Sequence, residues 1–419
     1  MKIQHLLPAG VLLGLLPLLL ANSYYITPWG FFGHRLINKM AVFTLPSDMI
    51  GAYKPHLEYL SEHAVDPDKR RYATHFEAVR HYIDLDYWGP NAVDSLPRDW
   101  TQALLYHAYY QLLTSSGDTL WFKPDEAAPR TSDSIRLVLQ YGDTSAVLSL
   151  PIEKYRDFVI EFVRDAYYEE RRLITCDQWR IVMGTAFTPA DCKEVLALEP
   201  FSKHGMLPYF LPQIQRQLTE AFRQRQPARI LRLSAEIGHY IGDAHVPLHT
   251  TTNYNGQLTG QTGIHAFWES RLPELFALGE YNFFTGKATY IVDIQEFYWG
   301  VVRQSHLLVD SVLHLEKQLS ATYPSDAQYC FEERLGVTVR TPCTDYARVY
   351  HEALNGMVER RMREAIRAIG SAWLTAWVDA GQPDLSMLKN KSTAGGSVDD
   401  VVAQERPAEN SAAVRPHED

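Results

Sequence analysis

The sequence lacks several features that would assign a function class at once. It contains no glycine-rich loop of the kind that cradles phosphates and no internal repeat. It also lacks an excess of basic residues, because the 419-residue chain carries a formal net charge of −10 at pH 7. This balance argues against stable packaging of nucleic acid. It does not exclude a nuclease whose bound metal ions supply the local positive charge.

The sequence also lacks a comfortable membrane span near its start. The apolar stretch at residues 6–20 is too short to cross a bilayer and contains two prolines. Lys2 precedes this stretch, and Ala21 and Ser23 follow it at the small-residue spacing that a signal peptidase reads. We therefore expect a signal peptide at 1–23 and an exported protein, either periplasmic or secreted.

Cysteine is scarce, with four residues in the whole chain. Pairing of neighbours, Cys176 with Cys192 and Cys330 with Cys343, would close two short loops and would fit an oxidising compartment. Spacing alone leaves the connectivity open.

Apolar periodicity predicts a mainly α-helical domain over 24–382. Helices are expected at 34–65, 96–114, 208–244, 294–320 and 346–379. Residues 115–203 have a different texture and form a predicted insertion of mixed structure. Its segment RLVLQYGDTSAVLSL predicts a β-hairpin, and ITCDQWRIVMGTAFTPADC is also strand-like. The tail at 383–419 has no periodicity and is predicted to be disordered.

The segment HYIGDAHVPLH at 239–249 concentrates metal-binding side chains. His239 and Asp243 are four residues apart, so in a helix they project from one face. Pro247 cannot lie in a helix interior, so a turn there should present His249 from a bend. Imidazoles and a carboxylate brought together in this way are suitable ligands for zinc. A helix end with histidines packed by chance is the alternative.

Other His and carboxylate pairs accompany this segment. His265 and Glu269 repeat the four-residue spacing. Further members are Asp66, His81 beside Tyr82 and Asp84, and His34 five residues after Trp29. Together these groups would supply about three metal ions with about three protein ligands each, which leaves positions open for water and substrate.

These motifs resemble those of the zinc-dependent phospholipase C superfamily, which includes the fungal and plant single-strand-specific nucleases. The matching segments, in order, are WGFFGH at 29–34, Asp66 followed fifteen residues later by HYID at 81–84, HYIGDAHVPLH at 239–249, and HAFWE at 265–269. The resemblance covers about 29–90 and 205–275 well, the C-terminal helices loosely, and 115–203 not at all. It implies the multi-helix fold and the trinuclear zinc cluster of that family.

The resemblance also implies an assignment of ligands. One zinc would be held by Asp66, His81, His239 and Asp243, a second by His249, His265 and Glu269, and a third by His34, Asp243 and the Trp29 backbone. Asp66 would also orient the nucleophile, and Lys69 would bind a phosphoryl oxygen. Cleavage after Ser23 leaves five residues ahead of Trp29, so we expect three zinc ions, or two if the Trp29 site is incomplete. His245 occupies a position where the family has no ligand.

The favoured function is an exported zinc-dependent hydrolase that cleaves single-stranded DNA or RNA. Tyr82 could stack a base, and Asp84 could read its edge. One alternative is a phospholipase C acting on phospholipids, because phospholipases of the family tend to carry Glu at the position of Glu269. A second alternative is an inactive zinc-binding surface protein. Nothing in the sequence indicates a stable protein partner.

Overall fold

A computed structural model describes residues 31–388, apart from 72–73, 75, 126, 128–132, 165–170 and 335. The expected signal peptide at 1–23, Trp29 and the tail beyond Leu388 therefore lie outside the described residues.

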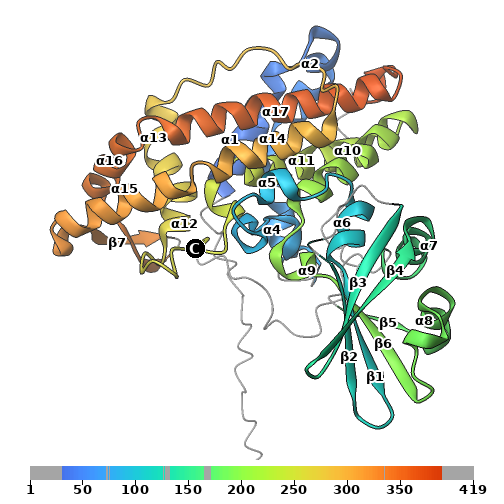
Figure 1. The fold of residues 1–419 in the computed structure, drawn as a ribbon. Coiled ribbons are helices and arrows are strands. Elements are labelled where there is room, and N and C mark those ends of the chain that lie inside the picture. The colour runs from blue at the N-terminus through green and yellow to red at the C-terminus, as the bar shows by residue number, and fades with distance from the viewer. Residues whose placement is uncertain are drawn as a thin grey trace, which may run out of the picture.

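Helices dominate the described chain, and two groups of them pack into one body (Figure 1). The first group comprises α1 (Phe31–Ala41), α2 (Ser47–Tyr53), α3 (Leu57–Glu62), α4 (Asp66–Arg70), α5 (Ala92–Ser95) and α6 (Trp100–His107). The second comprises α9 (Phe201–His204), α10 (Leu207–Arg223), α11 (Pro227–Ala244), α12 (Ile264–Ala266), α13 (Leu272–Glu280), α14 (Ile294–His306), α15 (Val309–Thr322), α16 (Thr344–Ala353) and α17 (Met357–Asp379). The expectation of a mainly α-helical protein is confirmed.

Helix α11 is the centre of this body. It packs against α1, α3, α10 and α17, and every residue from Leu233 to Ala244 is buried. A helix that is enclosed on all sides can place polar side chains in the interior only where other groups satisfy them. The polar residues of its last two turns therefore require partners from the surrounding helices.

The segment between the two helical groups forms an antiparallel sheet with strand order β4-β3-β2-β1-β6-β5. Its strands are β1 (Tyr109–Thr114), β2 (Thr119–Pro124), β3 (Ser134–Tyr141), β4 (Thr144–Pro151), β5 (Arg171–Ile174) and β6 (Cys192–Leu198). Helices α7 (Ile152–Phe158) and α8 (Cys176–Met183) lie beside it (Figure 1). Tyr110 and Phe122 point to this side and are buried against Phe158 and Trp179.

The sheet corrects two sequence expectations and confirms one. The helix expected at 96–114 ends at His107, because the following YYQLLT alternates between half-buried and buried positions as β1. The segment at 176–183 is helix α8 and not a strand, since Thr175 and Gln178 form a capping box that starts a helix. The hairpin around YGDTS is present as β3 and β4.

Both disulfides pair neighbouring cysteines, Cys176 with Cys192 and Cys330 with Cys343. The first joins α8 to β6, and the second holds a hairpin of β7 (Tyr329–Arg334) and β8 (Val337–Pro342) against the start of α16. Two disulfides indicate an oxidising, extracellular environment. Among the described helices, none is long and apolar enough to cross a membrane.

The tail expected to be disordered from 383 begins with an ordered part. Residues Leu385–Leu388 form a short 3₁₀ helix, and both of its leucines are buried. Trp377 donates from its indole nitrogen to the Pro383 carbonyl. The structure therefore extends the folded domain to Leu388, because these leucines complete the core beside α2.

Candidate metal centre

Two glycines of α11 allow the side chains of the candidate metal centre to meet. A Cβ at Gly238 would lie 1.9 Å from Asn38 Oδ1, and one at Gly242 would lie 2.8 Å from His34 Nδ1. Helix α1 can approach α11 so closely only because these positions carry no side chain. The approach places the His34 ring, stacked at 4.0 Å on that of His239, next to Asp243.

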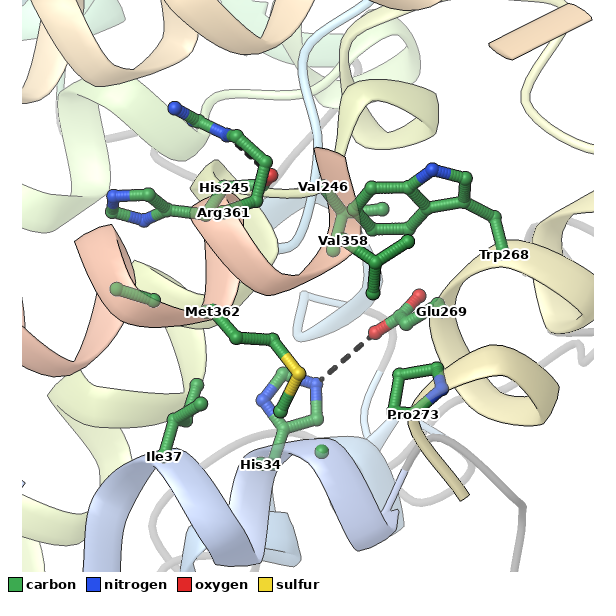
Figure 2. A pocket seen from close by; sticks show the side chains of 13 residues that line it. His34, Ile37, His245, Val246, Trp268, Glu269, Pro273, Val358, Arg361 and Met362 are labelled. Carbon is green, nitrogen blue, oxygen red and sulfur yellow. Dashed lines mark hydrogen bonds and ion pairs between the residues drawn. The ribbon is translucent and has the colours of Figure 1, made fainter. Parts of the chain in front are cut away.

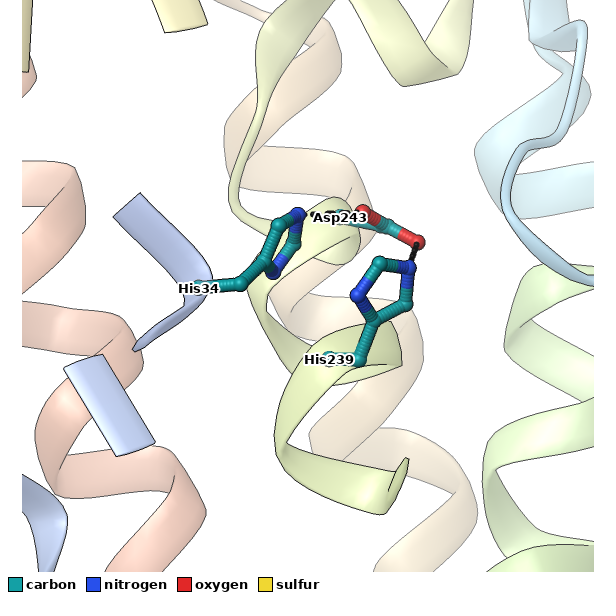
Figure 3. A group of neighbouring side chains, drawn as sticks. All are labelled: His34, His239 and Asp243. Carbon is teal, nitrogen blue, oxygen red and sulfur yellow. Dashed lines mark ion pairs between the residues drawn. The ribbon is translucent and has the colours of Figure 1, made fainter. Parts of the chain in front are cut away.

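The Asp243 carboxylate faces both His34 and His239 (Figure 3). Its Oδ1 is 3.3 Å from His34 Nε2, and its Oδ2 is 3.3 Å from His239 Nε2. The three side chains are buried, and one donor atom of each lies within 4.8 Å of the others. As predicted, His239 and Asp243 share one face of a helix.

A second group joins Asp68, His81 and His239, again with donor atoms within 4.8 Å. His81 Nδ1 lies 2.9 Å from Asp243 Oδ2, 3.0 Å from His239 Nε2 and 3.7 Å from Asp68 Oδ1. His81 follows a 3₁₀ turn at Ala78–Arg80, which ends at this point in the interior.

The carboxylate in this group is Asp68 and not the expected Asp66. Asp66 binds its neighbours in sequence instead, with 2.5 Å to His63 Nδ1 and 2.7 Å to Lys69 Nζ. Residues two apart in a helix point to nearly opposite sides, so α4 can direct only one of these carboxylates to His81. The spacing of fifteen residues to His81 favoured Asp66, whereas the three-dimensional arrangement selects Asp68.

The third group comprises His249, His265 and Glu269. Glu269 Oε2 is 2.8 Å from His265 Nε2 and 3.3 Å from His249 Nε2, while its Oε1 is 3.3 Å from His34 Nε2. Glu269 lies in a π-helical turn at Phe267–Arg271, a distortion that occurs often at functional sites. His249 comes from the bend after Pro247 that the sequence predicted.

Backbone carbonyls set the orientation of three of these imidazoles. The Nδ1 atoms of His239, His249 and His265 lie 2.9, 2.6 and 3.1 Å from the carbonyls of Ala64, His81 and Tyr254, respectively. A proton on each Nδ1 leaves the Nε2 lone pair facing the carboxylates. Such outer hydrogen bonds are the usual support for metal-binding histidines.

A buried carboxylate, which the sequence analysis did not single out, supports His81. Glu77 Oε1 lies 3.6 Å from His81 Nε2, on the side of the ring away from the cluster. Glu77 is fully buried and accepts hydrogen bonds from Arg70, Arg80 and the Tyr240 hydroxyl. The guanidinium groups hold the pKa of Glu77 well below its usual range, although burial opposes this shift. The four-residue spacing of Glu77 and His81 is the same as that of His239 and Asp243, so this spacing was the signal that could have found Glu77.

The cluster concentrates negative charge in the interior. Burial lowers the pKa of His81 to about 3 and that of His249 to about 4, so both rings are neutral at pH 7. Burial raises the pKa of Asp243 well above its usual range, and the carboxylates of Asp68 and Glu269 raise it further. Arg71, buried with its Nη1 3.7 Å from Asp68 Oδ1, supplies one positive charge. Buried carboxylates in this arrangement would be relieved by cations.

The remaining predicted residues surround the cluster without joining these groups. Lys69 is part-exposed and paired with Asp66. Tyr82 is buried, and its hydroxyl donates to the Lys203 carbonyl, so its ring does not offer a face for stacking a base. Asp84 is also buried and lies 3.2 Å from His204 Nδ1. We therefore replace the expected stacking role of Tyr82 with a structural one.

A small cavity of about 40 Å³ borders the cluster beside His34 and Glu269 (Figure 2). Its other walls are mainly apolar side chains, namely Ile37, Val246, Trp268, Pro273, Val358 and Met362. His245 also lines it, but its Nδ1 lies 2.7 Å from the Ile241 carbonyl and it belongs to none of the three groups.

Comparisons with family models, with curated proteins and with solved structures found no match to this chain. The protein is mainly α-helical, carries two disulfides, and buries several His, Asp and Glu groups that could bind metal ions.

Proposed function

We propose that this protein is an exported, zinc-dependent phosphodiester hydrolase, and specifically a nuclease that cleaves single-stranded DNA or RNA. The observation that carries the proposal is that three His and carboxylate groups adjoin one another. The first two share His239, and the third lies beside them, with Glu269 Oε1 3.3 Å from His34 Nε2 and His249 Nε2 3.9 Å from Asp243 Oδ1. Neighbouring groups that share ligands favour several metal ions close together, which is the arrangement used for phosphoester hydrolysis.

The residues fit zinc better than the other common metal ions. Five imidazoles, from His34, His81, His239, His249 and His265, meet three carboxylates, from Asp68, Asp243 and Glu269. Calcium and magnesium prefer shells made of oxygen, whereas imidazole together with carboxylate suits zinc. When bound, zinc would supply Lewis acidity and would lower the pKa of a coordinated water. Trp29 would add a ligand only if its backbone reaches this cluster.

The side chains of the protein would divide the remaining work. Asp243 and Glu269, each close to histidines from two groups, would hold neighbouring ions at a set separation. Arg71 would neutralise part of the charge on a bound phosphodiester, because its guanidinium is buried next to Asp68. Asp66 and Lys69, paired at 2.7 Å at the edge of the site, would orient the incoming water and contact a phosphoryl oxygen.

Phospholipase C activity is the second candidate, and Glu269 favours it. The two activities share the same metal chemistry and differ in what approaches the cluster. An inactive zinc-binding protein is the third, but metal storage would not account for the Asp66–Lys69 pair.

A substrate panel tests these candidates. The purified protein is assayed on single-stranded DNA, RNA and phosphatidylcholine, first loaded with zinc and then after exhaustive treatment with a chelator. We expect two to three zinc ions per chain by elemental analysis, and hydrolysis of the nucleic acids that stops on chelation. Hydrolysis of phosphatidylcholine alone would select the phospholipase. Zinc without turnover of any substrate would select the binding protein. Full activity after removal of all metal would reject the proposal.

A further inference from the structure

An open groove of about 1080 Å³ lies where the sheet meets the helical body. Its walls come from the 3₁₀ turn η5 (Leu85–Trp88), from the end of α6 and from strands β1, β2 and β3. In Figure 1, α6 and α9 lie at this junction, above the strands. The strands belong to the segment 115–203 and its border, for which the sequence provided no function.

The groove side of the sheet carries aromatic rings next to a lysine. Successive side chains of β1 point to opposite faces of the sheet, so Tyr110 faces α7 while its neighbour Tyr109 faces the groove. Trp121 on β2 lies with its ring centre 6.1 Å from that of Tyr109. The exposed Lys123 amine lies 5.9 Å from both ring centres. The described residues that line the groove include no carboxylate.

The opposite wall lies close in sequence to the metal centre. Tyr87 is 50 % exposed, and one face of its ring stacks on His204 with the centres 3.4 Å apart. His204 in turn lies 3.2 Å from Asp84, which follows the cluster residue His81. Six residues span at most about 22 Å, so Tyr87 lies within that distance of His81 along this wall.

We infer that the groove binds a single-stranded polynucleotide and extends the substrate site away from the metal centre, with Trp121 and Tyr87 as stacking platforms and Lys123 as a phosphate contact. This inference rests on the proposed function, and it implies that long single strands are better substrates than dinucleotides. Aromatic rings that line an open groove beside a cation suit unpaired bases, because every base has a face that can stack. Bases in a duplex are already stacked and offer no free face, so the groove should select single strands.

Binding is tested with the zinc-loaded full chain and a fluorescein-labelled (dT)12 whose phosphorothioate linkages slow cleavage. Trp121→Ala should weaken binding roughly 5- to 150-fold, the range for loss of one base–aromatic stack. Trp121→Phe keeps a stacking face and should retain most of the affinity. Lys123→Ala should reduce the slope of log affinity against log salt by about 0.7, as expected for one lost contact to a single strand.

Two matched controls lie on the same domain. Tyr141→Ala removes an exposed ring; Tyr141 does not line the groove, although its neighbour Gln140 does. Lys154→Ala removes an exposed charge on α7, on the other side of the sheet. Both should bind (dT)12 like the wild type. A 12-base-pair duplex should bind more weakly than (dT)12.

Hydrolysis separates this inference from the proposed function. In the wild type, kcat/KM should be higher for a 12-mer than for a dinucleotide. Trp121→Ala should reduce kcat/KM for the 12-mer about tenfold. If the dinucleotide is cleaved but Trp121→Ala and Tyr87→Ala bind (dT)12 like the controls, the groove assignment is wrong and the nuclease proposal stands. Binding of (dT)12 that depends on Trp121, without hydrolysis of any nucleic acid, would support the groove and reject the nuclease. Loss of phosphatidylcholine vesicle binding in Trp121→Ala, with (dT)12 binding unchanged, would assign the groove to lipid and overturn the inference.

Discussion

Replacing Asp243 with asparagine should change the stability of this protein in opposite directions with and without metal. The substitution preserves shape and volume and removes one negative charge from the centre of the cluster. If the buried carboxylate only completes an internal ionic network, its replacement should lower the stability both with and without metal. A carboxylate held ready for cations is unfavourable without them and favourable with them.

The distances set the magnitude. Asp243 Oδ1 and Glu269 Oε1 each lie 3.3 Å from His34 Nε2, so the two oxygens are at most about 6.6 Å apart. At an effective dielectric constant of about 20, two negative charges at that separation repel by about 2.5 kcal/mol. The same limit holds for Asp68 and Asp243, because His81 Nδ1 lies 3.7 Å from Asp68 Oδ1 and 2.9 Å from Asp243 Oδ2. Protonation and Arg71 offset part of this repulsion, so we expect Asp243→Asn to stabilise the metal-free protein by about 1 kcal/mol or more.

With metal bound, Asp243→Asn should lower the stability instead of raising it. Zinc at a hundred times its Kd stabilises the wild type by about 2.7 kcal/mol per independent site, and the variant should lose at least one site. The assay is thermal unfolding at pH 8, followed by circular dichroism, after chelation and again with excess zinc. Zinc content is measured in parallel, and turnover should fall at least about 100-fold. A variant that is less stable than the wild type under both conditions, or that keeps its zinc and its turnover, would refute the reasoning.

Three further predictions concern single residues outside the three groups. Glu77→Gln should lower the free energy of unfolding in urea by about 3 kcal/mol, because the buried Arg70 and Arg80 each lose a charged partner. Glu58→Gln at an exposed ion pair should change it by less than about 1 kcal/mol. Equal effects of the two substitutions would contradict the burial of the Glu77 network. His245→Ala should retain its zinc and reduce activity by less than roughly tenfold, and loss of a zinc ion would make His245 a ligand. Burial raises the pKa of Glu274 to about 7; its contribution to stability is therefore complete below pH 4.5 and is lost as the pH rises through 7. The melting temperature of Glu274→Gln relative to the wild type should accordingly rise from pH 5 to pH 8, and parallel pH profiles would count against this.

The helical parts of the cluster could be predicted because their geometry is local. His239 with Asp243, and His265 with Glu269, share a helix face through four-residue spacing alone. Pro247 had to end the helix before His249 for an equally local reason. The hairpin at YGDTS and the short disulfide loops also depend on residues close in sequence.

Tertiary packing decided the features that join distant segments. Asp66 and Asp68 are equivalent as sequence letters, and only the docking of α4 beside α11 determines which carboxylate reaches His81. Glu77 and Arg71 gain importance from burial, which no spacing predicts. The groove depends on a strand, β1, that the helical periodicity of 96–114 concealed. Local spacing sets which side chains share a face of one element, whereas long-range packing sets which faces meet and how dry the space between them is. For this protein the amino-acid sequence therefore identified most of the side chains that could bind metal ions, and the tertiary structure determined which carboxylate of α4 joins them and how they are grouped.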